Sequence, residues 1–128
     1  MKLSFRDLTV YKKAFELAMK IFELSKTFPK EETYSLTDQI RRSSRSVCSC
    51  ISEAYRKRNY QAYFISKSSD ADMENYETQV WLDFAYKCGY LNKNDYTNLI
   101  NQSEEIGKLL NHMIENPEKY LRKNEKSK

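Results

Sequence analysis

Residues 34–60, YSLTDQIRRSSRSVCSCISEAYRKRNY, carry the clearest helical repeat of the chain. Apolar or small residues recur there at spacings that alternate between four and three, which places them on one face of an α-helix. These residues are Leu36, Ile40, Ser43, Val47, Cys50 and Ala54. A face of this kind packs against other helices, and its small members permit close approach. The stretch therefore predicts a helix that begins near Ser35, ends near Arg58 and faces a core.

The same stretch accounts for the net charge of the whole chain. It holds six basic and two acidic residues, whereas the rest of the chain holds 16 of each. At about 100° per residue, four of its arginines fall within one quadrant opposite the apolar face. The six basic residues, which form the candidate nucleic-acid-binding set, are Arg41, Arg42, Arg45, Arg56, Lys57 and Arg58. Such groups could follow a phosphate backbone without reading the bases.

Aromatic residues near this basic face add a second element of nucleic-acid recognition. Tyr55, Tyr60 and Tyr63 could stack on unpaired bases. The alternative is that the tyrosines belong to the core or to an interface and that the arginines form a solvated face or pair with acidic residues of a neighbouring subunit.

Composition favours helices. The 128 residues include only two Gly and two Pro, too few for the turns of a β-rich or nucleotide-binding fold, and their number fits one domain. We expect that domain to span residues 1–117 and the polar residues 118–128 to fray.

Three cysteines without a signal peptide fit a reducing cytoplasm. No apolar run approaches the roughly 20 residues of a membrane span, so no membrane role is expected.

Three further helices are predicted by the same criteria. Asp7 is the expected N-cap of the first, which reaches about Lys26. A break around Arg58 and Asn59, with Asn59 as a cap, leads into a long helix over residues 60–88. Gly89 suits the C-terminal cap of this long helix. The last helix begins at a cap near Asn92 and ends near residue 116. The apolar stripe of the first helix consists of Val10, Ala14, Leu17, Ile21, Leu24 and Phe28. The stripe of the long helix over residues 60–88 consists of Met73, Tyr76, Val80 and Phe84, with Trp81, Ala85 and Cys88 beside it. The stripe of the last helix consists of Tyr96, Leu99, Ser103, Ile106, Leu110 and Met113.

Four amphipathic segments with short connections predict an all-α fold, an up-down-up-down antiparallel four-helix bundle. The helices are long for so small a protein, which leaves surface for self-association. We therefore expect a homo-oligomer.

Several blocks of sequence also resemble a known bacterial family. They are FRDLTVYKKA (5–14), FPKEETYSLTDQIRRSSRSV (28–47), ISEA (51–54) and ETQVWLDFAYKCGYL (77–91). In this order they are similar to the family called four helix bundle proteins or 23S rRNA intervening sequence proteins. Ser52 and Ala54 stand where that family usually has Ala and Gly. The resemblance implies a homopentameric bundle, distantly similar to the accessory subunit of diversity-generating retroelements, which binds nucleic acid and a reverse transcriptase.

Glu53 and Glu77, two acidic residues within these blocks, have two interpretations. Arg42, Glu53 and Glu77 are expected to form a structural polar cluster between the second and third helices, because a partly buried carboxylate needs a cationic partner. A catalytic acid–base pair is the sharper alternative. No catalytic residue is assigned, and we expect the protein not to be an enzyme.

Metal and cofactor sites are not expected. Asp70, Asp72 and Glu74 point in different directions on a helix, and so do Cys48 and Cys50. His112 is the single histidine, and the chain has no Gly-rich phosphate loop. Two functions remain from the sequence: a nucleic-acid-binding accessory protein that binds RNA or DNA through the basic face, or an adaptor that binds another protein and uses its arginines in subunit contacts.

Overall fold

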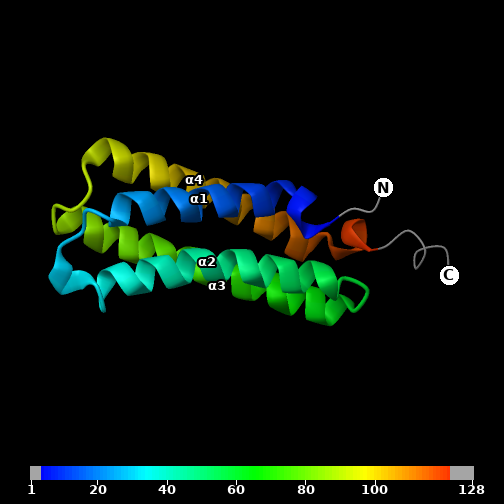
Figure 1. Cartoon of the computed structure of the whole chain (residues 1–128). Helices are drawn as coiled ribbons and strands as arrows, with labels where there is room; N and C mark the ends of the chain where they lie inside the picture. The colour runs from blue at the N-terminus through cyan, green and yellow to red at the C-terminus, as the bar shows by residue number, and fades with distance from the viewer. Residues whose placement is uncertain (1–3, 122–128) are drawn as a thin grey trace.

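A computed structural model describes residues 4–121 and shows four helices packed as a bundle (Figure 1). The described elements, in chain order, are η1 (Phe5–Asp7), α1 (Thr9–Ser25), η2 (Lys30–Glu32), α2 (Leu36–Arg56), α3 (Gln61–Lys87), α4 (Lys93–Glu115) and η3 (Pro117–Tyr120), where η denotes a short 3₁₀ helix. The described part of the chain contains no β-strand. The predicted all-α four-helix bundle is therefore confirmed.

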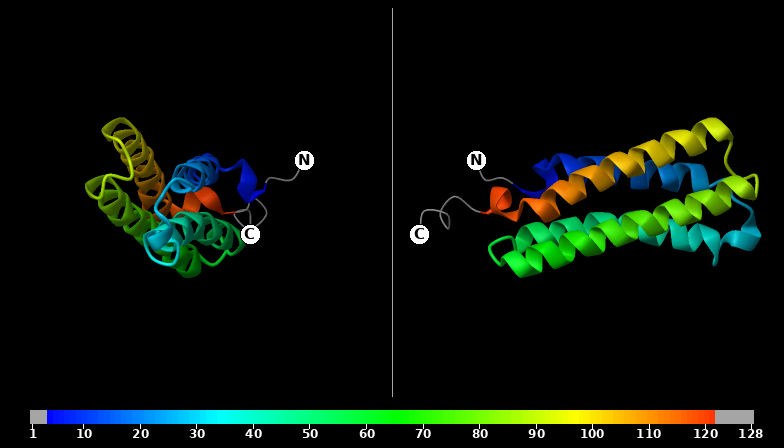
Figure 2. Two further views of the ribbon diagram at one scale, coloured as in Figure 1. Left: turned by 60° about the vertical axis from the view of Figure 1, so that its left-hand side comes forward. Right: turned by 180° about the vertical axis from the view of Figure 1, so that it is seen from behind.

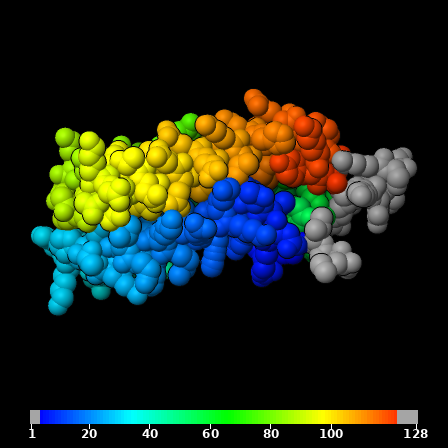
Figure 3. Space-filling view, turned by 90° about the horizontal axis from the view of Figure 1, so that it is seen from above, coloured from blue at the N-terminus to red at the C-terminus, as the bar shows by residue number. Residues whose placement is uncertain are grey.

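Helices that follow one another in the chain lie next to one another in space, and each runs antiparallel to the one before it (Figures 1 and 2). The α2–α3 contact is the most extensive, and the α1–α4 contact is the least extensive of the four neighbouring pairs. Figure 3 looks onto the α1–α4 side, where the two helices meet along a seam. No described helix has both the length and the apolar character that crossing a bilayer requires.

The predicted stripes of the first, second and fourth helices face the core. In α1 and the loop after it, Val10, Ala14, Leu17, Ile21 and Phe28 are buried, and Leu24 is half-buried. All six predicted stripe residues of α2 are buried, and so is the flanking Ile51. In α4 the buried residues include Leu99, Ser103, Ile106, Leu110 and Met113. The helical repeat therefore predicted which faces of these three helices are buried.

The third helix is the exception, because its predicted core stripe lies on the outside. Met73, Tyr76, Val80 and Phe84, which we call the α3 ridge, are 67%, 62%, 46% and 54% exposed. Beside the ridge, Ala85 is buried as expected, Trp81 is half-buried and Cys88 is exposed. The buried face of α3 is instead Phe64, Ser68, Ala71, Asn75, Thr78, Leu82 and Ala85. The prediction of the buried face was wrong because α3 carries two stripes, and the more apolar one faces outward.

Small and polar residues suit the buried face of α3 because they bond to its neighbours. Thr78 Oγ1 donates to Ser43 Oγ of α2 at 2.9 Å. On the other side, Asn75 Nδ2 donates to the Ser103 carbonyl of α4 at 2.8 Å, and Ser103 Oγ donates to Asn75 Oδ1 at 2.9 Å. Gln79 Nε2 also donates to Ser103 Oγ at 2.9 Å. These bonds satisfy buried polar groups and fix the position of α3 relative to both neighbours.

Neither α1 nor α2 receives a side-chain hydrogen bond from the residue at its N-terminal cap position. Asp7 does not cap α1; it forms a capping box with Ser4 around η1, and the cap position of α1 is Leu8. Ser35 occupies the cap position of α2 without a side-chain bond, and Glu32 Oε1 accepts the Leu36 N–H at 3.2 Å. At α2 the acceptor that a helix start needs for its free N–H groups therefore comes from the preceding turn.

The ends of α3 show one wrong prediction and one that is confirmed. Asn59 does not cap the helix, because Tyr60 occupies the cap position and the Asn59 side-chain oxygen is buried without a partner among the described residues. Gly89 has φ of 80° and ends the helix as predicted. The Gly89 N–H donates to the Tyr86 carbonyl, and the Tyr90 N–H donates to the Ala85 carbonyl. This pair of bonds is the Schellman arrangement, which requires the left-handed residue.

The chain after α4 folds back on the bundle. Pro117 is buried, and the ring of Tyr120 in η3 stacks on Phe64 with 5.4 Å between centroids. Residues 118–120 therefore belong to a short helix rather than to a frayed tail, and Tyr120 covers the buried aromatic residue at the start of α3. The rest of the predicted tail, residues 122–128, lies outside the described residues.

Glu32 joins two loops at one end of the bundle, and this contact gives a testable prediction. Tyr90 Oη donates to Glu32 Oε2 at 2.9 Å, and this hydrogen bond raises the pKa of Tyr90 from 10.0 to about 12. The raised pKa means that the contact stabilises the fold below pH 10 and loses this effect as the pH rises toward 12. We expect Glu32→Gln to bring the Tyr90 pKa back toward 10, measured by tyrosine ionisation in difference spectra against Tyr90→Phe.

The matched control is Glu31→Gln, which removes the neighbouring carboxylate but leaves the hydrogen bond. It should shift the Tyr90 pKa much less. A Tyr90 pKa that does not move in Glu32→Gln would show that the Glu32 carboxylate is not its cause.

Candidate nucleic-acid interface

The six predicted basic residues lie along α2 and the turn that follows it, but they are not equally exposed. Arg42, Arg45, Arg56 and Lys57 are exposed, and Arg41 and Arg58 are half-buried. The exposed arginines lie opposite the buried stripe of α2, as the helical repeat predicts. We call Arg42, Arg45, Arg56 and Lys57 the α2 basic face.

Arg41 binds the neighbouring helix. Its Nε donates to Ser25 Oγ at 2.8 Å, its Nη2 donates to the Phe22 carbonyl at 3.5 Å, and its guanidinium lies 4.7 Å from the centre of the Phe22 ring. Arg45 lies over the same ring at 5.5 Å and remains exposed. Arg41 therefore joins the start of α2 to the end of α1, and its replacement would disturb packing as well as charge.

The turn between α2 and α3 collects cations and aromatic rings. Arg58 Nη1 donates to the Tyr55 carbonyl at 2.7 Å, and its guanidinium covers the Tyr55 ring at 3.9 Å. Lys57 Nζ lies 5.7 Å from the Tyr60 ring and 5.2 Å from the Tyr63 ring. Tyr60 and Tyr63 are 65% and 38% exposed, so their rings are open to a stacking partner, whereas Tyr55 is covered by Arg58.

The predicted cluster of Arg42, Glu53 and Glu77 is not formed. Arg42 Nη1 lies 3.9 Å from Asp38 Oδ2, one turn earlier on α2. Glu53 Oε1 lies 3.6 Å from Lys67 Nζ on α3, and Glu53 raises the pKa of Lys67. Arg42 and Glu53 are too far apart on one helix to share a cluster, about 16 Å at 1.5 Å per residue. Glu53 pairs with a cation, as expected, but that cation is Lys67 of the next helix and not Arg42.

Glu77 lies next to Glu74 on α3, and the pKa of Glu74 is raised first by burial and then by the Glu77 carboxyl group. Among residues 4–121, no three His, Cys, Asp or Glu side chains converge as a metal site would require. Cys48 is a free thiol whose burial raises its pKa to about 11, and burial also raises the pKa of Asp72. His112 Nδ1 lies 3.1 Å from Tyr120 Oη, next to the chain that folds back after α4.

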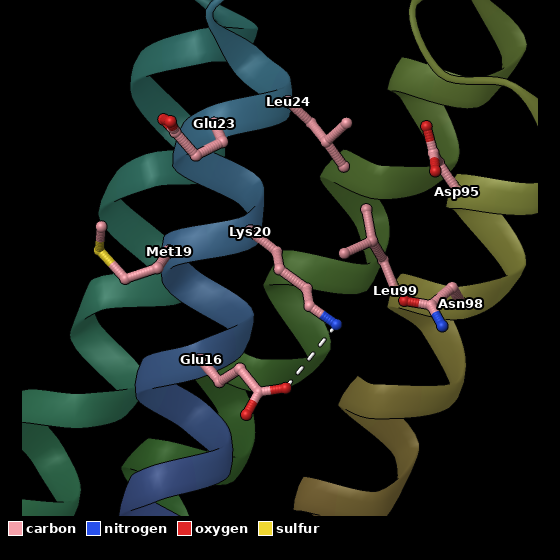
Figure 4. Close-up of a pocket in the computed structure, with 8 residues that line it drawn as sticks. All are labelled: Glu16, Met19, Lys20, Glu23, Leu24, Asp95, Asn98 and Leu99. Atoms are coloured by element: carbon pink, nitrogen blue, oxygen red, sulfur yellow. Dashed lines mark ion pairs between the residues drawn. The ribbon is translucent and has the colours of Figure 1, made fainter.

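The sequence interpretation missed a groove between α1 and α4 (Figure 4). Its volume is about 500 Å³, and its lining residues, here called the α1/α4 groove, are Glu16, Met19, Lys20, Glu23, Leu24, Asp95, Asn98 and Leu99. Leu24 and Leu99 supply apolar surface, and Met19 lies at the edge with 49% of its surface exposed. Lys20 pairs with Glu16 at 3.7 Å and Lys26 pairs with Glu23 at 2.8 Å, which leaves Asp95 as the further acidic group of the rim. The groove joins residues far apart in the chain, so no local sequence signal could have revealed it.

The bundle geometry and the arrangement of α2 agree with a family comparison. Residues 6–112 match the family model described as 23S rRNA-intervening sequence protein. The chain belongs to this family. The match spans all four helices and so includes the α2 basic face, the α3 ridge and the α1/α4 groove.

A solved structure supports membership in the 23S rRNA-intervening sequence protein family. It is the crystal structure of a protein of unknown function of the S23 ribosomal protein family from Bacteroides thetaiotaomicron. The two chains are 34% identical with a TM-score of 0.76, and the similarity covers 83% of this chain and 95% of the other. A comparison with curated proteins gives no match. The likeness therefore supports the fold and the family.

Proposed function

We propose that this protein is a non-enzymatic, homo-oligomeric bundle protein that binds the backbone of RNA or DNA through the α2 basic face. The observation that carries the proposal is the state of the exposed cations. Among the described residues, no carboxylate forms an ion pair with Arg45, Arg56 or Lys57. Cations left without acidic partners along one helix suit the phosphates of a nucleic-acid backbone.

Aromatic rings support single-stranded segments as the ligand. Tyr60 and Tyr63 lie beside Lys57 at the end of the basic face and expose their rings. Stacking on such rings accepts any base, in agreement with backbone contacts that carry no sequence preference. The chemistry would be shared by RNA and DNA, so binding assays should include both.

Self-association forms the second part of the proposal. The α3 ridge exposes four large apolar side chains on one helix face, and exposed apolar patches of this kind mark interaction sites. The family resemblance implies a pentamer. We place the assembly in a reducing cytoplasm, with which the free thiols of Cys48, Cys50 and Cys88 are compatible.

The α3 ridge also favours an alternative function. A surface of methionine, valine and aromatic side chains resembles the centre of a protein–protein interface. The protein would then be an adaptor that binds another protein, and the arginines would serve subunit contacts. A wild-type protein that does not bind nucleic acid would favour this second function.

The test of nucleic-acid binding is charge reversal at two exposed positions, Arg45→Glu/Arg56→Glu. Arg41 is left unchanged because it joins α1 to α2. Binding of single-stranded RNA and DNA is measured at about 50 mM and about 200 mM salt. We expect at least about a tenfold loss of affinity at low salt and a salt slope smaller by about two.

The matched control is Lys12→Glu/Lys108→Glu, which makes the same change of charge at exposed positions of α1 and α4. It should reduce affinity much less than the α2 variant. Wild-type protein that fails to bind at low salt, or equal losses in the two variants, would contradict a specific role of the α2 basic face.

A further inference from the structure

Three aromatic side chains line the outer side of α1 next to α2. Tyr11, Phe15 and Phe22 follow one another at spacings of four and seven residues, so helical geometry places them within about 40° of one another. The rings of Tyr11 and Phe15 stack with 6.1 Å between centroids, and Phe15 is 43% exposed. Arg41 of α2 lies over the Phe22 ring, which places this side of α1 beside α2. We call the three residues the α1 aromatic strip.

The α2 basic face adjoins this strip. Arg41 donates to Ser25 of α1, so its side of α2 faces α1. At about 100° per residue, Arg45 lies about 40° and Arg56 about 60° from Arg41 around the helix. Arg45 also lies 5.5 Å from the centre of the Phe22 ring and remains exposed. Exposed guanidinium groups and exposed aromatic surface are therefore neighbours along the seam between α1 and α2.

The other flank of α2 meets acidic groups instead. Glu53 of α2 lies 3.6 Å from Lys67 of α3, and the same ammonium group lies 3.6 Å from Asp70. Further along α3, the pKa of Glu74 is raised by burial and then by the carboxyl group of exposed Glu77. Carboxylates repel a phosphate backbone, so the charges direct a nucleic acid on α2 toward α1 and away from α3.

The carboxylates of α1 and α2 themselves each lie beside a cation. The pairs are Glu16–Lys20, Glu23–Lys26, Asp38–Arg42 and Glu53–Lys67. Glu16 and Glu23 also line the α1/α4 groove, on the side of α1 that faces α4 (Figure 4). The acidic groups of the two helices are thus already balanced, and the exposed arginines next to the strip remain available to phosphates.

The strip continues toward the end of the bundle that carries the α2–α3 turn (Figure 1). Phe5 of η1 packs edge-on against Tyr11 with 4.9 Å between centroids, and the Arg6 guanidinium lies 4.5 Å from the centre of the Phe5 ring. The η1 segment also contacts α2. The exposed rings of Tyr60 and Tyr63 belong to the turn at this same end. Aromatic surface therefore extends from the turn along the seam, and the strip alone covers about 16 Å of α1.

We propose that the nucleic acid bound by this protein is a single strand that lies along the seam between α1 and α2, with phosphates on Arg45 and Arg56 and bases on the α1 aromatic strip. The inference rests on the proposed nucleic-acid-binding function and assigns the path of the strand and the surface that contacts its bases. In a duplex the bases are already stacked on one another, so a duplex contacts the arginines only.

The test removes the exposed ring of the strip in the full-length protein. Phe15→Ala deletes this ring, and Phe15→Tyr keeps an aromatic ring in the same place. Tyr76→Ala is the matched control, because it deletes an exposed ring on the outer face of α3. Binding of single-stranded RNA and DNA of about 16 nucleotides is measured at about 50 mM and about 200 mM salt. Circular dichroism and light scattering report folding and oligomeric mass.

We expect Phe15→Ala to lose about tenfold in affinity for single strands, since one stacked base is lost. Its salt slope should equal that of the wild type because Phe15 neutralises no phosphate, whereas Arg45→Glu/Arg56→Glu should reduce the slope. Phe15→Tyr and Tyr76→Ala should bind like the wild type. A duplex of the same length should bind equally to the wild type and to Phe15→Ala.

Photocrosslinking of the wild-type protein locates the bases independently of any variant. A bromouracil-substituted strand is irradiated in the complex, and the modified peptide is identified by mass spectrometry. We expect attachment within α1, at the residues of the aromatic strip. Attachment to Tyr60, Tyr63 or Tyr76 without attachment to α1 would place the bases elsewhere and overturn the inference.

Failure of the inference can be told from failure of the proposed function. A wild-type protein that binds neither RNA nor DNA at low salt would overturn both. If Arg45→Glu/Arg56→Glu weakens binding and Phe15→Ala does not, the backbone site stands and the path along α1 is wrong. An equal loss in Tyr76→Ala would show that the effect is not specific to α1. A changed oligomeric mass in Phe15→Ala would assign the strip to a subunit contact, which also overturns the inference.

Discussion

Replacing Phe64 with alanine is expected to lower the free energy of unfolding by about 3–5 kcal/mol, the usual cost of deleting a fully buried phenylalanine. Phe64 has 0% exposure and stands in the first turn of α3. Its ring stacks on Tyr120, so alanine would leave a cavity and also remove the surface on which η3 packs. Urea denaturation followed by circular dichroism measures the change.

The control for this prediction is Tyr34→Ala, since Tyr34 is 95% exposed. Removal of that aromatic ring should change the free energy of unfolding by no more than about 0.5 kcal/mol. Both variants should be measured at the same protein concentration, because self-association would add to stability. A loss below about 1 kcal/mol in Phe64→Ala would contradict the burial described for this residue.

The helical repeat predicted the fold because three of the four helices bury their most apolar stripe. In α2, for example, Leu36, Ile40 and Val47 are all buried as the repeat indicates. The third helix shows the limit of this reasoning. A repeat identifies a stripe but does not say whether the same chain covers it, and the bonds that make Asn75 and Thr78 suitable for the core come from α4 and α2.

The ends of the helices were less predictable because their caps depend on local geometry. Gly89 could be predicted, since the left-handed conformation that ends α3 favours glycine. The acceptor at the start of α2 is Glu32, which a preceding turn brings back to the Leu36 N–H. A pattern of residues around Ser35 does not contain that turn.

The candidate site was predicted in outline and not in its contacts. Helical geometry alone places the arginines of α2 on one side. It does not show that Arg41 binds Ser25, sixteen residues earlier, or that Glu53 pairs with Lys67 on the next helix. The α1/α4 groove depends on the distance between two helices that are not consecutive, so no local signal reports its shape.

The polar contacts of α3 lead to the second large effect. Asn75→Asp replaces a buried amide by a carboxyl group of nearly the same shape, and we expect a loss of about 3–5 kcal/mol at neutral pH. Asn75 is 2% exposed, and its Nδ2 donates to the Ser103 carbonyl at 2.8 Å. An ionised carboxylate would place a second acceptor there, near the carboxylate of Asp72 and without a cation among the described contacts of Asn75.

The pH dependence separates the effect of a buried charge from the loss of the amide donor. Burial raises the pKa of a carboxyl group above the roughly 3.9 of an unfolded aspartate, so the unfolded state releases its proton first. The added instability is therefore small below about pH 4 and grows by about 1.4 kcal/mol per pH unit until the folded carboxyl also ionises. Unfolding of the variant and the wild type across this range gives the difference.

Asn101→Asp is the matched control, because Asn101 is exposed on the same helix as Ser103. Its carboxylate remains in water, so its stability relative to the wild type should depend little on pH. If Asn75→Asp were equally destabilised at every pH, loss of the Nδ2 donor to Ser103 would explain its effect and buried charge would not. If the dependence appears, the buried face of α3 accepts polar side chains only when they are neutral and hydrogen-bonded, as Asn75 is.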